Sequence, residues 1–264
     1  MKILNFLFSR SKQEQDKSIR DKLKTRKDFE RVLAEDLDIM ETTKARIDTA
    51  KNINLYMYRS LSYSYILILQ SKYSVDAKID ELRDIYIKSM YYFLQAFNKR
   101  NPIYADILNY VSLGVLLNIP DNNFRQLIDY VKQMDKQGKP SGWTPDLLLW
   151  FMLNSRLKEQ EKLKYAETLA YPRLYNGLYK VIQAPNAAAA KDALNKYLDR
   201  WYNLNSDAPW YNSHLKDNCY RGYWAWEVAA VAKIMHIDDS DLKNNQYYPY
   251  DMVHWADNET TAKE

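Results

Sequence analysis

The stretch RGYWAWEVAAVAKIMHIDDSD, residues 221–241, decides the fold of this chain. If a helix spans about Tyr220 to Ile237, its apolar residues form two stripes at spacings of three and four. One stripe contains Trp224, Val228, Val231 and Met235, and the other contains Trp226, Ala230, Ile234 and Ile237. A helix that is apolar on most sides is typical of an element buried inside a domain. The stretch therefore predicts a helical domain built around this segment.

Glu227 interrupts the apolar surface of this predicted helix, and no basic residue lies three or four positions away. A carboxylate buried without hydrogen-bond donors is very costly, so tyrosine hydroxyls, an indole N–H or a distant arginine must satisfy it. We interpret Trp224 and Glu227 as structural support that ties the helix to its neighbours. Direct contact of Glu227 with a partner is the alternative.

The acids after the helix favour a binding surface. Asp238, Asp239 and Asp241 crowd into one turn, where solvent or a cationic partner must relieve their repulsion. The following stretch NNQYYPYDMVHWAD, residues 244–257, mixes tyrosine and tryptophan with further acids. Tyrosine offers apolar area together with a polar tip, which suits a protein–protein interface better than a catalytic pocket.

Outward from this region, the chain is predicted to be all-α, a multi-helix bundle of two packed helical units. Five glycines and eight prolines in 264 residues suit long helices. The polar stretch DKQGKPSG, residues 135–142, is the predicted linker between an N-terminal domain at 13–135 and a C-terminal domain at 143–258. Ser74 and Thr144 are the predicted N-caps of the helices that follow them.

Composition and targeting signals favour a cytoplasmic protein without a membrane partner. The single Cys219 excludes an internal disulfide, which suggests a reducing compartment. The apolar run from Ile3 to Phe8 is shorter than the roughly 7–15 residues of a secretory core. No apolar run approaches the roughly 18 residues of a membrane span.

The net charge of +4 conceals a split along the chain, since residues 1–200 carry +9 and residues 201–264 carry −5. Such asymmetry hints at a charged partner. The basic N-terminal arm, residues 9–31, is interrupted by five acids and lacks any nucleic-acid motif. We interpret it as a solvated helix and expect no direct contact with nucleic acid.

Catalytic motifs are missing from the sequence. The glycines form neither a dinucleotide fingerprint nor a phosphate loop, and no HExxH, paired CxxC or nucleophile elbow occurs. Cys219 beside His214 suggests a nucleophile only weakly, because a lone cysteine is more often a packed residue. We therefore predict no enzyme, no catalytic residue, no metal and no cofactor.

A helical metal-dependent enzyme is the first alternative. Asp251 and His254 lie three residues apart, and His236 lies two residues from Asp238. The repeated Glu-x-x-His pair of helical metal enzymes is absent, however. A non-catalytic helical adaptor is the second alternative. The sequence does not predict the oligomeric state.

The stretch GYWAWEVAAVAKIMHIDDSDL followed by YYPYDMVHWA resembles the C-terminal domain of the PoNi proteins, over roughly 37 residues from Arg221 to Asp257. The matching pieces are Gly222-Tyr223-Trp224, Glu227, the alanine-rich run, Ile237-Asp238-Asp239-Ser240, and Tyr248-Pro249 with Asp251. Trp226 and Tyr250 depart from the residues expected at their positions. Residues 13–135 fit the family's helical N-terminal domain in general character.

The resemblance implies an immunity protein against PoNe polymorphic DNase toxins, which contact-dependent systems such as type VI secretion deliver. It implies neutralisation without catalysis, and a cognate DNase toxin as the partner. A DNase must present a basic surface to phosphates, and carboxylates would be steered to that surface. We therefore expect partner contacts at Asp238, Asp239, Asp241, Tyr248 and Asp251.

Overall fold

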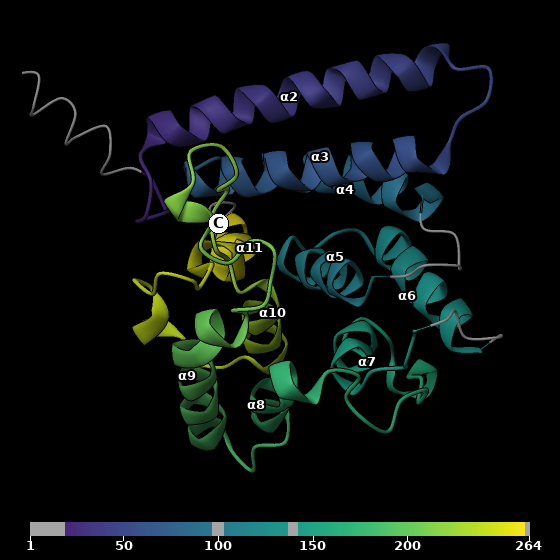
Figure 1. Cartoon of the computed structure of the whole chain (residues 1–264). Helices are drawn as coiled ribbons and strands as arrows, with labels where there is room; N and C mark the ends of the chain where they lie inside the picture. The colour runs from purple at the N-terminus through teal and green to yellow at the C-terminus, as the bar shows by residue number, and fades with distance from the viewer. Residues whose placement is uncertain (1–18, 97–102, 137–141, 262–264) are drawn as a thin grey trace, which may run out of the picture. The chain divides into compact units, whose positions relative to one another are not determined.

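The computed structural model describes residues 19–96, 103–136 and 142–261, and in these ranges the chain is all-α, as predicted. None of the helices described there combines the length and apolar composition that a membrane span needs. The α-helices of the described residues, shown in Figure 1, are α2 Arg26–Thr49, α3 Leu55–Ser74, α4 Ile79–Ala96, α5 Tyr104–Leu116, α6 Asp121–Lys136, α7 Leu147–Asn154, α8 Pro172–Ile182, α9 Ala187–Leu204, α10 Trp226–Met235 and α11 Tyr250–Thr261. Short 3-10 helices lie between the α-helices, at Glu159–Glu161, Ser213–Leu215 and Ser240–Leu242.

The helices form two compact units, and the chain passes between them more than once. Unit 1 comprises residues 1–93 and Asn212–Tyr223, and unit 2 comprises residues 94–211 and 224–264. A short segment from the C-terminal half of the sequence therefore completes the N-terminal unit. This division is different from the sequence domains 13–135 and 143–258.

Helix α10 is the centre of unit 2, because it packs against α5, α7, α8, α9 and α11. Its alanines and valines at 228–232 are buried, and the small side chains let neighbouring helices approach closely. The prediction of a helix buried inside its domain is confirmed.

The two ends of α10 differ from the prediction of a helix from about Tyr220 to Ile237. Gly222 has φ 105°, a conformation that favours glycine, and the chain stays irregular until Trp226. At the other end His236 adopts a left-handed conformation with φ 52°. The Ile237 N–H then bonds to the Ala232 carbonyl at 3.0 Å, which closes the helix and directs the chain into the acid turn.

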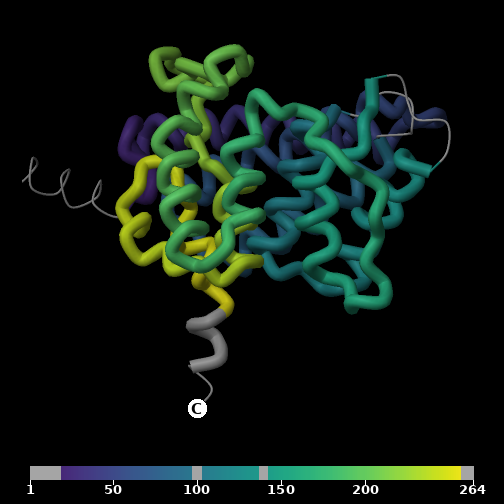
Figure 2. The backbone as a smooth tube through the Cα atoms, turned by 90° about the horizontal axis from the view of Figure 1, so that it is seen from below, coloured from purple at the N-terminus to yellow at the C-terminus, as the bar shows by residue number. Residues whose placement is uncertain are grey.

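Helices α8 and α9 form a close pair in unit 2, and their path can be followed in green in Figure 2. The approach is closest at Gly177, where an added Cβ would lie 2.6 Å from the ring of Tyr197. Pro172 starts α8 and the Asn186 side chain caps α9 by accepting from the Ala189 N–H at 2.9 Å. This close packing fixes how α9 is rotated about its own axis, and therefore which of its side chains point away from α8.

In unit 1, α2 and α3 lie side by side and run in opposite directions (Figure 1). Thr25 and Asp28 form a capping box at the start of α2. The inner face of α2 is formed by the buried residues Phe29, Val32, Met40 and Ile47, whereas Leu37 is 37% exposed.

The segment Asn212–Tyr223 is fastened to unit 1 by buried polar contacts. Arg221 pairs with Asp36 through two bonds of 2.6 Å, and the Asp36 side chain is only 2% exposed. The Tyr220 hydroxyl donates to Asp21 at 2.5 Å, and the Ser74 hydroxyl donates to the Arg221 carbonyl at 2.9 Å. Unit 1 therefore depends on residues that the chain supplies late.

Two predicted helix caps are wrong. Ser74 ends α3 instead of starting α4, because Asp76 turns the chain with φ 79°. The N-cap of α7 is Asp146, whose carboxylate accepts from the Leu149 N–H at 2.8 Å, and Thr144 precedes it. Most of the predicted linker lies outside the described residues, but Asp135 is part of α6 and is buried.

Substitution of Arg221 by alanine should lower the free energy of unfolding by about 3 kcal/mol, because it leaves the Asp36 carboxylate buried without its guanidinium. The double variant Arg221→Met with Asp36→Leu should recover most of the loss. Urea unfolding measures both. Lys44→Ala, which breaks the exposed Lys44–Asp48 pair in the same unit, is the control, and an equal effect in that variant would contradict the prediction.

Gly177→Ala should destabilise the protein by about 1–3 kcal/mol, because the new methyl group overlaps the buried Tyr197 ring. Thermal or urea unfolding gives the value. Gly142→Ala is a useful comparison, since nothing lies within 4 Å of an added Cβ there and only the positive φ of 79° opposes it. If Gly177→Ala destabilised the protein no more than Gly142→Ala, α8 and α9 would be packed less closely than the 2.6 Å distance indicates.

Candidate functional site

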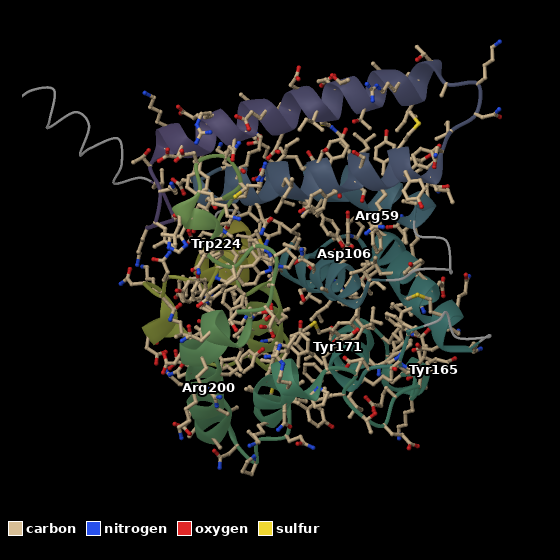
Figure 3. The ribbon with its side chains drawn as sticks, viewed as in Figure 1. Arg59, Asp106, Tyr165, Tyr171, Arg200 and Trp224 are labelled. Atoms are coloured by element: carbon tan, nitrogen blue, oxygen red, sulfur yellow. The ribbon has the colours of Figure 1, made fainter. Side chains whose placement is uncertain are left out.

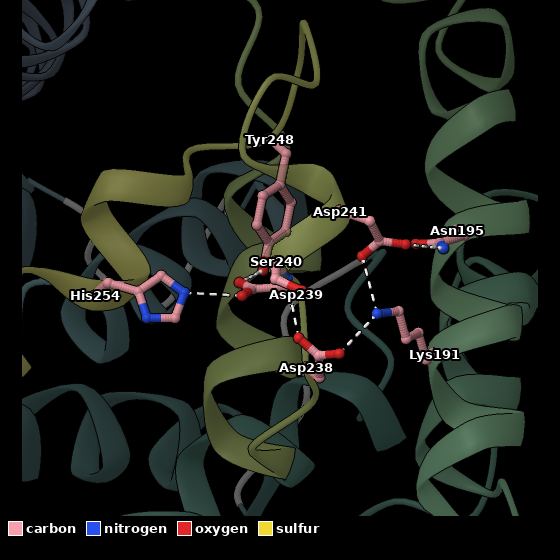
Figure 4. Close-up of polar contacts among 8 residues, drawn as sticks. All are labelled: Lys191, Asn195, Asp238, Asp239, Ser240, Asp241, Tyr248 and His254. Atoms are coloured by element: carbon pink, nitrogen blue, oxygen red, sulfur yellow. Dashed lines mark hydrogen bonds and ion pairs between the residues drawn. The ribbon is translucent and has the colours of Figure 1, made fainter.

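The acid turn, Asp238–Asp241, joins α10 to the segment that leads into α11 (Figure 4). Asp238 and Asp241 are exposed and face α9. The Lys191 ammonium lies 2.8 Å from an oxygen of Asp238 and 3.2 Å from an oxygen of Asp241. Asn195 donates its amide to Asp241 at 3.0 Å. A lysine of the same chain therefore relieves the repulsion between these two acids.

Hydrogen bonding stabilises the charged forms of this cluster. The hydrogen bond from Lys191 is the largest cause that lowers the pKa of Asp238, and the bond from Asn195 is the largest cause that lowers the pKa of Asp241. The bond to Asp238 in turn raises the pKa of Lys191. At neutral pH two carboxylates face one ammonium, so the exposed side of the turn keeps a net negative charge.

Asp239 points in the opposite direction, into the fold. Its side chain is 3% exposed and accepts from the Tyr248 hydroxyl at 2.6 Å, and His254 Nε2 lies 2.8 Å from its other oxygen. Tyr248 precedes α11 and His254 belongs to it. The turn thus connects α9 on one side to α11 on the other.

A group of aromatic rings continues this surface along α9. Lys191, Asn195 and Tyr202 share one face of α9, within about 40° of one another at 100° per residue. Tyr247 packs parallel to Tyr202 with ring centroids 5.4 Å apart, so the segment after the acid turn follows the same helix. Trp210 and Tyr211 add two further rings against Trp201 and Tyr202.

We call the combined surface the α9 face. Its acidic part contains Asp238 and Asp241, and its aromatic part contains Tyr202, Trp210, Tyr211 and Tyr247, all four of them half-buried. Tyrosine and tryptophan are enriched in protein-binding surfaces, and charged groups such as these carboxylates suit the polar rim of such a surface. The α9 face is the candidate functional site.

Glu227 lies beneath the aromatic part of the α9 face. Its carboxylate accepts from the Trp201 indole N–H at 2.6 Å, which is one of the donors considered from the sequence. Part of the residue is exposed, but its carboxyl group is surrounded by protein, and this desolvation raises its pKa to about 7. Burial raises the pKa values of Tyr175 and Tyr197, and the charge of the Glu227 carboxylate raises them further. Glu227 therefore positions Trp201, which supports Trp210 from below.

The structure separates the five residues expected to contact a partner. Asp238, Asp241 and Asp251 are exposed, whereas Asp239 and Tyr248 are 3% and 2% exposed and bond to each other. The two buried residues therefore contribute to the site by holding the turn. Trp224 is also buried, with its ring 6.1 Å from that of Trp226.

The sequence did not indicate the contribution of α9 and of the loop that follows it, namely Lys191, Asn195, Tyr202, Trp210 and Tyr211. These residues lie 27 or more positions before the acid turn in the sequence. The spacing of Lys191, Asn195 and Tyr202 on one helical face was a usable signal. The pairing of that face with the acid turn was not, because it depends on how α9 packs beside α10.

The residues considered for catalysis have other contacts. His254 pairs with Asp239, and His214 Nδ1 lies 2.9 Å from the Tyr223 hydroxyl. Cys219 is exposed, with its sulfur 3.8 Å from the Ser213 carbonyl. Within the described ranges, no three His, Cys, Asp or Glu side chains are grouped so that they could hold a metal ion.

Acids and rings displayed on one face of an all-α unit make this chain a candidate protein-binding module. Two family models match the sequence: "PoNe immunity protein (PoNi), N-terminal" over residues 9–129, and "PoNe immunity proteins (PoNi), C-terminal" over residues 144–252. Together they span most of the chain. The protein belongs to the PoNi family of immunity proteins, a non-catalytic family whose name implies neutralisation of a PoNe toxin.

A solved structure supports the fold. Protein PA2201 from Pseudomonas aeruginosa matches with a TM-score of 0.69 over 92% of each chain, at 18% sequence identity. At this identity the likeness concerns the fold alone. No curated protein matches the sequence.

Glu227→Gln should change how stability depends on pH. Because the pKa of Glu227 is higher in the folded protein than its ordinary value of 4.5, its carboxyl adds stability that is complete below pH 4.5 and is lost as the pH rises through about 7. The variant should therefore gain about 2–3 kcal/mol relative to the wild type between pH 5 and pH 8. Urea unfolding at both pH values measures this. The control Glu167→Gln, at an exposed position, should show no such change. If the free energies of unfolding of Glu227→Gln and the wild type changed with pH in parallel, the prediction would be contradicted.

Proposed function

We propose that this protein binds and neutralises a cognate antibacterial DNase toxin of a contact-dependent, type VI-like secretion system by covering its DNA-binding or catalytic surface. The match of both PoNi models to this chain carries the proposal. The α9 face supplies the surface, because it combines the exposed carboxylates of the acid turn with half-buried rings from α9, from the loop after α9 and from the segment before α11.

Electrostatics supports a basic partner. A DNase must hold phosphates, so its functional surface is rich in lysine and arginine. Asp238 and Asp241 together outweigh Lys191 by one charge, and their exposed side chains can accept further donors. Opposite charges mainly increase the association rate and fix the orientation.

Lasting affinity requires apolar contact, which the rings of the α9 face supply. Tyrosine and tryptophan are enriched among the residues that dominate binding energies. Tyr202 and Tyr247 are already packed against each other, and Trp210 rests on Trp201, so their side chains lose little freedom on binding. The acids would therefore guide the toxin and the rings would hold it.

Protection of cells is the direct test. Co-expression with its cognate PoNe toxin should restore growth to cells that the toxin arrests, and the purified pair should form a complex. A helical adaptor would bind without protecting. Growth arrest despite confirmed expression of both proteins would overturn the proposal.

The double variant Asp238→Asn with Asp241→Asn should associate with the toxin about tenfold more slowly at low ionic strength, because it removes the exposed carboxylates without adding a lysine beside Lys191. Surface plasmon resonance at two salt concentrations measures the rate. The matched control, Glu159→Gln with Glu161→Gln, removes two exposed charges two residues apart elsewhere in unit 2. Equal association rates for the two double variants would show that the acid turn does not face the toxin.

A further inference from the structure

A lysine of α9 lies between the two exposed acids of the acid turn (Figure 4). The ammonium of Lys191 is 2.8 Å from Asp238 Oδ2 and 3.2 Å from Asp241 Oδ1. A turn that served only to attract a basic partner would be better without this cation, because Lys191 cancels the charge of one of the two carboxylates. The position of Lys191 therefore requires an explanation other than attraction.

Donors of the same chain hold each exposed carboxylate at both of its oxygens. Asp238 accepts from Lys191 at Oδ2 and from the backbone N–H of Ser240 at Oδ1, at distances of 2.8 and 3.2 Å. Asp241 pairs with Lys191 through Oδ1 at 3.2 Å and accepts from the Asn195 amide at Oδ2 at 3.0 Å. Because Lys191 contacts both acids, it restrains their separation as well as their directions.

The outer sides of both carboxylates stay open to a partner. The side chains of Asp238 and Asp241 are 69% and 46% exposed, whereas that of Lys191 is 29% exposed. An ionised carboxylate has about four lone-pair sites, so each of these acids can accept further hydrogen bonds from the solvent side. Lys191 is the least accessible member of the group.

Without Lys191 the two acids would be free to move apart. Like charges in one turn repel each other when no cation lies between them. A partner would then have to immobilise both side chains on binding, and this ordering opposes the complex. In the free protein Lys191 already restrains them, so a partner meets acids that are in place.

We propose that Lys191 is a positioning residue of the α9 face, which holds Asp238 and Asp241 in the orientation that receives lysine or arginine side chains of the cognate toxin. This inference rests on the proposed function, since it takes a basic toxin surface as the partner. Lys191 acts through the two acids and does not itself contact the toxin. Its charge slows association, and the orientation that it imposes slows dissociation.

The variant Lys191→Met separates these two effects. It should associate with the toxin about twofold faster at low ionic strength, because the turn becomes more negative, and dissociate about tenfold faster, because the acids lose their common donor. Surface plasmon resonance measures both rates. Lys191→Arg keeps the charge and several donors, and its dissociation rate should lie within about twofold of the wild-type rate.

Lys196→Met is the matched control, since it removes another lysine of α9 that pairs with an aspartate, Asp192, at 2.6 Å. Lys196 lies about 140° around the helix from Lys191, on the side of Arg200, which is labelled in Figure 3. This control should dissociate at the wild-type rate. Exposed ion pairs add little stability, so both variants should unfold at the same urea concentration as the wild type.

A double-mutant cycle shows whether Lys191 acts through the acids. In a protein that already carries Asp238→Asn and Asp241→Asn, Lys191→Met should leave the dissociation rate unchanged, because no carboxylates remain to be oriented. An equal increase in both backgrounds would mean that Lys191 contacts the toxin directly, and would overturn the inference. Unchanged or slower dissociation of the single variant Lys191→Met would also overturn it.

The free protein offers a test that needs no toxin. Three-bond NMR couplings to the β-protons of Asp238 and Asp241 report the rotamers of these side chains. Each acid should have one rotamer in the wild type and an average of several in Lys191→Met. Fixed rotamers in the variant would overturn the inference and leave the proposed function intact. If the toxin does not bind the wild type, the proposed function fails, and the role of Lys191 in the complex fails with it.

Discussion

The packing of five helices around α10 is the constraint on which the larger unit depends. A helix surrounded on so many sides must be short and must carry small apolar residues, and the run from Val228 to Ala232 meets both requirements. Helix α10 can hold few polar groups, and the carboxyl of Glu227 is tolerated there because the Trp201 indole N–H donates a hydrogen bond to it. Since the acid turn follows α10 directly, the position of the candidate site is fixed by the same packing.

Aromatic side chains in this protein act as hydrogen-bond donors to buried acids as well as packing residues. Tyrosine hydroxyls or tryptophan indoles donate to Asp21, Asp135, Asp146, Glu227 and Asp239. Such donors satisfy a carboxylate without introducing a second charge that would also need desolvation. This use accounts in part for the 23 tyrosines and seven tryptophans of the sequence. It also leaves a carboxylate just below the aromatic part of the α9 face.

The sequence predicted the all-α class, the buried helix around Val231 and the family, because these depend on local periodicity and on one contiguous motif. The site was predictable only in part. Asp238 and Asp241 are exposed as expected, but adjacent residues in a turn point in different directions, and no pattern in the sequence indicated that Asp239 turns inward to Tyr248. The role of Lys191 could not be inferred, since its contact with the acid turn joins residues 47 positions apart. Likewise, nothing local indicates that Arg221 completes a unit whose other residues end at Phe93.

The late arrival of Arg221 has a consequence for synthesis on the ribosome. Helices α2, α3 and α4 emerge early, yet the guanidinium that neutralises Asp36 and the hydroxyl that binds Asp21 come more than 120 residues after Phe93. The first helices must therefore wait, incompletely assembled, until the chain has been translated past Tyr220 and Arg221. Unit 1 therefore cannot be completed before residues 94–211 of unit 2 have been synthesised, and its nascent helices are exposed to chaperones and proteases during that interval.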